Sequence, residues 1–94
     1  MEVRSENGVV LARAARGVQW QSATIAELDR SVFPMLAGIC PYADTVFNSW
    51  QRPMLLEELE RLPPERQGPW IEEIRAMCRT AEAGQHRYVW FLGD

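Results

Sequence analysis

Lysine is absent from this sequence of 94 residues, so every basic side chain is an arginine, and His86 is the single histidine. Long apolar runs are absent as well. None approaches the roughly 20 residues that a membrane-spanning helix requires, and the first residues, MEVRSENG, lack the basic-then-apolar order of a signal peptide. We therefore expect a cytoplasmic protein that does not bind membranes.

The sequence also lacks the residue spacings that accompany metal and phosphate sites. Cys40 and Cys78 are far apart and do not form a C-x-x-C pair. The glycines are isolated and match neither G-x-x-x-x-G-K nor G-x-G-x-x-G. A zinc site needs three or four ligands, whereas His86 has no carboxylate or cysteine at ligand spacing. We expect no metal, no cofactor and two free thiols.

Catalytic residues are equally hard to place. Nucleophilic catalysis requires a Ser, Cys or Thr beside a base that a third group orients, and here a cysteine would have to work with His86. Cys78 falls on the apolar side of a predicted helix, which favours a packing role, and His86 precedes the last strand, which favours a surface position. We predict no catalytic residue and no enzyme. A small enzyme that uses Cys40 or His86 remains an alternative.

Negative charge is confined to one part of the chain. Between Pro53 and Gly84 there are seven glutamates and four arginines, which accounts for the whole net charge of -3. Such a surface repels nucleic acid and anionic lipid and attracts basic proteins. We therefore expect no nucleic-acid binding, and we expect a partner protein at this surface to be basic.

Size and composition predict a single α+β domain over residues 1–94, because a chain of this length with 47% apolar residues can build one core. The dipeptide Asn7-Gly8 separates two strand-compatible runs, residues 1–6 and 9–14. Asn-Gly is typical of the two-residue type I′ turn of a β-hairpin. The sequence therefore predicts an N-terminal hairpin.

The middle of the chain has weaker signals. Thr24 and Glu27 have the spacing of a capping box, which predicts a short helix over residues 25–31 that Pro34 closes. The following segment, residues 35–42, mixes apolar residues with glycine and proline. We expect it to be a loop or a short extended piece.

Two helices and a strand are predicted for the second half. Pro53 suits the first turn of a helix, and leucines follow it at positions 55, 56, 59 and 62. The clearest helical pattern comes next, with apolar residues at 70, 71, 74, 77, 78 and 81 and Gly84 placed as the C-cap. The final HRYVWFLGD is apolar on both faces, which is typical of a central strand. The simplest packing is one antiparallel sheet of the hairpin and the last strand, with about three helices mostly on one face.

The stretch YADTVFNSWQRPMLLEEL places Asp44, Asn48, Trp50 and Gln51 directly before an apolar helix. One interpretation is structural, because Asn48 and Gln51 could hold the loop by bonding its backbone. The other is functional, because polar amides and a tryptophan before a rigid helix are suitable contact residues. Both interpretations stay open at this point.

Two pairs of adjacent glutamates complete the candidate partner-binding residues: Glu57 with Glu58, and Glu72 with Glu73. Neighbouring positions on a helix diverge by about 100° and do not face one another, so neither pair suits catalysis by two carboxylates. Both pairs are typical of solvent-exposed helix faces. A role in binding a partner is the alternative.

The segments DTVFNSWQRPMLLEELERL and AGQHRYVWFLGD resemble short bacterial proteins that share a D-T-x-F-N…Q…L-L-x-E-L core and end in an aromatic strand with F-x-G-D. The resemblance covers residues 44–62 and 84–94, and that group is associated with immunity proteins of toxin systems. The chain is also similar to small acidic ribonuclease inhibitors of the barstar type, although Tyr42-Ala43-Asp44 replaces their tyrosine-glycine-asparagine loop. The resemblance implies a binding protein and no catalytic residues.

These observations predict a non-enzymatic cytoplasmic protein of immunity or antitoxin type. It would bind a partner protein, for example a basic toxin, through its acidic helix faces and the loop of residues 44–51. The alternative is a self-associating structural or regulatory module, because an unpaired sheet edge or an exposed patch with Trp20 or Trp50 would form a homodimer.

Overall fold

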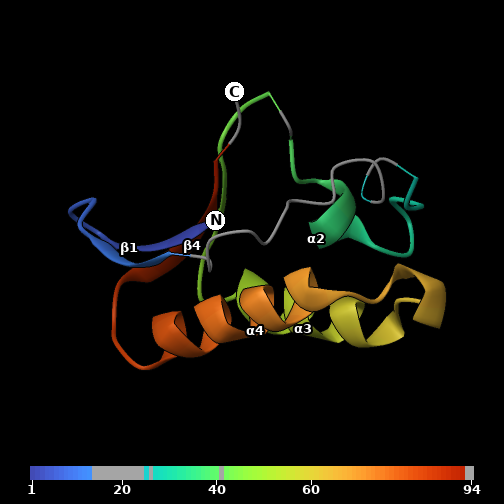
Figure 1. The fold of residues 1–94 in the computed structure, drawn as a ribbon. Helices are drawn as coiled ribbons and strands as arrows, with labels where there is room; N and C mark the ends of the chain where they lie inside the picture. Colours follow the sequence, from blue (N-terminus) through green and yellow to red (C-terminus); the bar gives the residue numbers. More distant parts are fainter. Residues whose placement is uncertain (14–24, 26, 41, 93–94) are drawn as a thin grey trace.

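The computed structural model describes residues 1–13, 25, 27–40 and 42–92, and its two longer helices lie side by side below the strands (Figure 1). The strands form one antiparallel sheet in the order β2-β1-β4-β3: β1 (Glu2–Ser5), β2 (Val10–Arg13), β3 (Thr45–Phe47) and β4 (Arg87–Phe91). The helices are α2 (Pro34–Ala37), α3 (Gln51–Arg61) and α4 (Pro69–Glu82). Helix α4 packs against β1, β2 and β4, and α3 contacts α4 and α2. The structure confirms the predicted α+β fold.

The hairpin between β1 and β2 forms as predicted, but its turn differs from the predicted type. A type I′ turn requires positive φ at both central residues. Gly8 has a φ of 83°, whereas Asn7 is not among the described residues with positive φ. The Gly8 N–H donates to the Ser5 carbonyl and the Ser5 N–H to the Val9 carbonyl, both at 2.9 Å. Residues 6–8 therefore form a three-residue loop with glycine in the left-handed position.

Strand β4 lies in the centre of the sheet, as its two apolar faces predicted. It pairs with β1 on one side and with β3 on the other, so that Val89 stands opposite both Val3 and Phe47. These three side chains are buried in the same core as the apolar residues of α3 and α4. On the other face of the sheet, the Arg4 guanidinium lies over the Trp90 ring, 4.5 Å from its centroid.

Two short elements between the hairpin and α3 differ from the predictions. Residues 45–47, predicted as part of a loop, form the edge strand β3, because all three are strand formers and Phe47 inserts into the core. Pro34, predicted to close a helix, instead begins α2, where its missing N–H costs nothing. Leu36 of α2 is fully buried. Elements of three or four residues are too short for hydrophobic periodicity to reveal.

The predicted capping box lies partly outside the described residues, since Thr24 is not described, and neither is residue 14 at the predicted end of the hairpin. Of the helix predicted over residues 25–31, Ile25 is helical and residue 26 is not described, whereas residues 27–31 lie in turns and bends. Asp29 organises one of these turns, because its Oδ1 accepts hydrogen bonds from the Ser31 hydroxyl at 2.7 Å and from the Ser31 N–H at 2.8 Å. Both bonds lower the pKa of Asp29, and the bond from the Ser31 hydroxyl has the larger effect.

Helix α4 confirms the clearest prediction, because all six apolar positions of the predicted face, from Trp70 to Ala81, are buried. Gly84 does not form its C-cap, however, since Ala83 occupies that position. A glycine suits position 84 for a different reason. A Cβ atom there would clash with the guanidinium of Arg87, whose Nη1 donates to the Thr80 carbonyl near the end of α4.

Helix α3 begins at Gln51, which places Pro53 in its first turn as predicted, and it ends before Pro63-Pro64 as predicted. Three of its four predicted leucines are buried, at positions 55, 59 and 62, while the fourth, at 56, is half-buried. No helix in the described part of the chain is both long and apolar enough to cross a membrane.

Candidate functional site

A reciprocal pair of side-chain hydrogen bonds fixes the start of α3. The Oδ1 of Asn48 accepts from the N–H groups of Trp50 and Gln51 at 2.9 and 3.0 Å, and the Oε1 of Gln51 accepts from the Asn48 N–H at 2.9 Å. This is a capping box with Asn48 in the N-cap role and Gln51 three residues later. The structural role considered for these two amides is therefore confirmed, and it explains why the helix begins before Pro53.

Trp50 lies within this cap, and 84% of its surface is exposed. Its backbone is already helical, with φ -78° and ψ -33°, so residues three, four and seven positions later share its side of the helix. These residues are Pro53, Met54 and Glu57, and all are exposed. We call Trp50, Pro53, Met54 and Glu57 together the Trp50 surface. It places a large aromatic side chain in solvent on a firmly capped helix.

The adjacent glutamates Glu57 and Glu58 have opposite environments. Glu57 is exposed, and its Oε1 lies 3.7 Å from the Arg61 Nε. Glu58 is only 1% exposed, and its carboxylate accepts hydrogen bonds from the Met35 N–H at 2.9 Å and the Leu36 N–H at 3.0 Å. The prediction that Glu58 lies on a solvent-exposed face is wrong, because it satisfies the free N–H groups at the start of α2. A partner protein cannot reach it.

The other predicted acids do not join the Trp50 surface. Glu72 and Glu73 lie near the beginning of α4, and Glu72 pairs with Arg75 on the same helix. The other end of α4, which approaches the start of α3, carries Glu82. Glu82 lies roughly 14 Å along the helix axis from Glu72 and Glu73. Asp44 is exposed just before β3. The structure thus gathers Asn48, Trp50, Gln51 and Glu57, and leaves Asp44, Glu72 and Glu73 apart.

Arg52 is a candidate residue that the sequence analysis missed. Its side chain is directed into the protein, with 9% of the residue exposed, and its Nη1 donates to the Arg87 carbonyl at 3.3 Å. No carboxylate of the described residues forms an ion pair with it. Arg52 stands three residues before Leu55 and seven before Leu59, so it occupies the first position of the buried stripe. A charged residue at a stripe position is the signal that would have revealed it.

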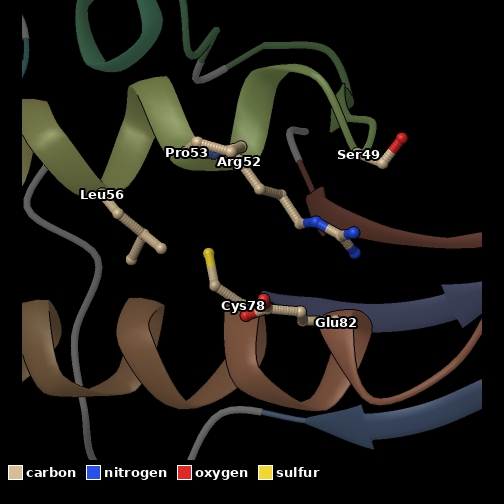
Figure 2. A pocket seen from close by; sticks show the side chains of 6 residues that line it. All are labelled: Ser49, Arg52, Pro53, Leu56, Cys78 and Glu82. Carbon is tan, nitrogen blue, oxygen red and sulfur yellow. The ribbon is translucent and has the colours of Figure 1, made fainter.

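Two hollows open beside Arg52. The smaller one, of about 220 Å³, lies between α3 and α4 and is lined by Ser49, Arg52, Pro53, Leu56, Cys78 and Glu82 (Figure 2). The larger one, of about 500 Å³, lies between the start of α3 and the segment that leads into β4; among its lining residues are Asn48, Trp50, Arg52, His86, Arg87 and Tyr88. We call this larger space the Arg52 hollow. Arg52 lines both hollows and places a positive charge between them.

Cys78 and His86, the two side chains considered for catalysis, each line one of these hollows. The Cys78 thiol is directed toward α3 (Figure 2), and burial raises its pKa to about 11, so it stays protonated and weakly nucleophilic at neutral pH. His86 is exposed, and its Nδ1 lies 3.7 Å from the Oε2 of Glu6. In the part of the chain that the structure describes, no group of three His, Cys, Asp or Glu side chains could hold a metal ion.

No family model matches the sequence, and comparisons with curated proteins and with solved structures found no significant match either. These comparisons do not test the resemblance to immunity proteins that residues 44–62 and 84–94 suggested. Within those segments, the structure places the start of α3 beside the loop that precedes β4, because both contribute residues to the Arg52 hollow.

Proposed function

We propose that this protein is a non-enzymatic binding protein of immunity type, which binds a partner protein through the Trp50 surface and the rim of the Arg52 hollow. The exposure of Trp50 on a capped helix is the observation that carries the proposal. Tryptophan is enriched at binding hot spots because it buries a large area. A side chain that already projects from a fixed helix loses less freedom on binding than one on a mobile loop.

Surface charge favours a basic partner. The chain has a net charge of -3, Glu57 belongs to the Trp50 surface, and Glu82 lines the smaller hollow. Arginines on the same helices partly offset Glu57 and Glu72. We therefore expect the acids to speed association with a basic protein more than they strengthen the final complex. A basic toxin neutralised by its immunity protein fits this charge pattern.

Capture of the partner from a lysate of the source cells tests the proposal, with wild-type protein, Trp50→Ala and Tyr42→Ala as baits. Tyr42 is a matched control, because it is 80% exposed but lies outside the Trp50 surface. We expect Trp50→Ala to weaken binding of the captured protein by about 2 kcal/mol, or roughly 30-fold, and Tyr42→Ala to leave it unchanged. Equal affinities for wild type and Trp50→Ala would overturn the proposal.

A homodimer is the second candidate, and the two outer strands favour it. Each of β2 and β3 pairs on one side only within the described sheet, and each carries an exposed apolar side chain, Leu11 and Val46 respectively. An unpaired strand edge is a template for another strand. A dimer in sedimentation velocity that Leu11→Lys or Val46→Lys abolishes would support this candidate, and a monomer would exclude it. Trp20, also considered for this role, lies outside the described residues.

A further inference from the structure

Arg52 is a buried cation that forms no ion pair with a described carboxylate. Its hydrogen bond to the Arg87 carbonyl uses Nη1 only. None of its other guanidinium nitrogens is a buried atom that lacks a hydrogen-bond partner. A buried charge is costly unless a counter-charge accompanies it. Because Arg52 lines the Arg52 hollow, an anion from outside the chain can reach the guanidinium.

Among the charged groups around the hollow, Arg52 is the one best suited to bind an anion. Arg87 also lines the hollow and likewise makes one hydrogen bond, from its Nη1 to the Thr80 carbonyl at 2.9 Å. Arg87 differs from Arg52 because the negative end of α4 partly balances its charge. His86 lies beside Glu6 at 3.7 Å. Glu82 lines the smaller hollow together with Arg52, but none of the ion pairs among the described residues joins the two. Cys78 is protonated at neutral pH and adds no negative charge.

The chemistry of a guanidinium indicates which anion fits. Its planar fork can donate two parallel hydrogen bonds to the two oxygens of a carboxylate. The backbone N–H groups of Trp50 and Gln51 at the start of α3 are not available to bind the anion, because both already donate to Asn48. Because the end of α4 partly balances the charge of Arg87, the charge that Arg52 presents matches the single charge of a carboxylate better than the nearly double charge of a phosphoryl group.

We propose that the Arg52 hollow binds a carboxylate group of the partner protein, either from an Asp or Glu side chain or from the C-terminus of its chain. This inference rests on the proposed function, because Trp50 lines the same hollow and would pack against the residues that flank the carboxylate. A partner that is basic overall and presents one carboxylate here would be held in a single orientation on the Trp50 surface. Arg52 then determines the register of the complex.

An NMR titration of the wild-type protein tests the subsite with three peptides: acetyl-Ala-Glu-Ala-amide, acetyl-Ala-Ala with a free C-terminal carboxylate, and the neutral acetyl-Ala-Gln-Ala-amide. The signals to follow are the Arg52 Nε–H and the Trp50 indole N–H. We expect saturable shifts with one or both carboxylate peptides, and the peptide that binds identifies the source of the carboxylate. Shifts no larger than those with the glutamine peptide, or tighter binding of inorganic phosphate, would overturn the proposal.

The variant Arg52→Lys keeps the charge but loses the planar fork, and we expect it to bind the better peptide at least about tenfold more weakly. Arg79→Lys is the matched control, because Arg79 is an exposed arginine of α4 that does not line the hollow. Unchanged affinity in Arg52→Lys would contradict the proposal. Where Arg52→Lys does not fold, the wild-type comparison of glutamate and glutamine peptides decides alone.

The outcomes separate this inference from the proposed function. Trp50-dependent capture of a partner without any carboxylate binding would refute the subsite and leave the proposed function standing. Carboxylate binding that depends on Arg52, together with partner capture that does not depend on Trp50, would refute the proposed function and support an anion site of this chain alone.

Discussion

Helices α3 and α4 lie beside one another (Figure 1) and pack into the same core. Their inner faces nevertheless differ in chemistry. The buried residues of α4 are all uncharged: Trp70, Ile71, Ile74, Met77, Cys78 and Ala81. Half of those on α3 are charged, namely Arg52 and Glu58, beside Leu55 and Leu59. A charge on an inner face costs stability unless a partner compensates it. The charges inside α3 therefore mark the places where this helix does more than pack.

Replacing Glu58 should have the largest effect on stability. In Glu58→Gln, an amide nitrogen replaces the Oε2 that accepts from the Met35 N–H at 2.9 Å, so two donors face each other. The bonds from the Met35 and Leu36 N–H groups to Oε1 also lose the charge of the carboxylate. We expect the free energy of unfolding to fall by about 3 kcal/mol. Urea denaturation measures this loss. The adjacent Glu57→Gln is the control and should change stability by no more than about 0.5 kcal/mol; similar losses in both variants would contradict the role of Glu58.

The buried thiol of α4 should give the next largest effect, and only at alkaline pH. Burial raises the pKa of Cys78 from 9.0 to about 11. The resulting stability is fully present below pH 9.0, and it is lost as the pH rises toward 11, because the unfolded thiol ionises first. Between these values, wild type should lose about 2 kcal/mol more than Cys78→Ala. Parallel stability curves for the two proteins would show that Cys78 is not protected by burial.

The contrast between α3 and α4 also explains how far the sequence predicts the fold. In α4 and β4, each residue type agrees with its burial, so periodicity and apolar faces predicted both elements. Glu58 could not be predicted as buried, because its hydrogen-bond partners are 22 and 23 residues away, in a helix of four residues that periodicity does not detect. Long-range polar partners of this kind leave no local pattern.

The candidate site was predicted only in part, again because long-range partners leave no local pattern in the sequence. The composition before α3 singled out Asn48, Trp50 and Gln51, and both amides act locally within a capping box. Arg52 was missed because its neighbours come from the loop and strand more than 30 residues later, where its bond to the Arg87 carbonyl spans 35 positions. Local motifs are visible in a sequence, while a hollow between distant segments is not.

A smaller loss of stability is expected from the cap that holds Trp50 in place. Asn48→Ala removes the acceptor of the Trp50 and Gln51 N–H groups, and it should lower the free energy of unfolding by about 1 kcal/mol. Thermal denaturation provides the measurement. Ser49→Ala is the control, because Ser49 is exposed and adjacent but does not belong to the capping box. If the two variants lose stability equally, Asn48 does not cap the helix.

The smallest effect on stability is expected at Arg52, the second buried charge of α3. This measurement tests whether the fold depends less on Arg52 than on Glu58. Arg52→Met keeps an apolar stem and removes a buried charge, at the cost of one hydrogen bond to the Arg87 carbonyl. The free energy of unfolding should therefore change by less than about 1 kcal/mol, in either direction. Chemical denaturation of the variant beside Glu58→Gln makes the comparison direct. A loss as large as that of Glu58→Gln would mean that Arg52 holds the fold together, as Glu58 does. Retained stability together with lost peptide binding would instead mean that an arginine at this position serves recognition.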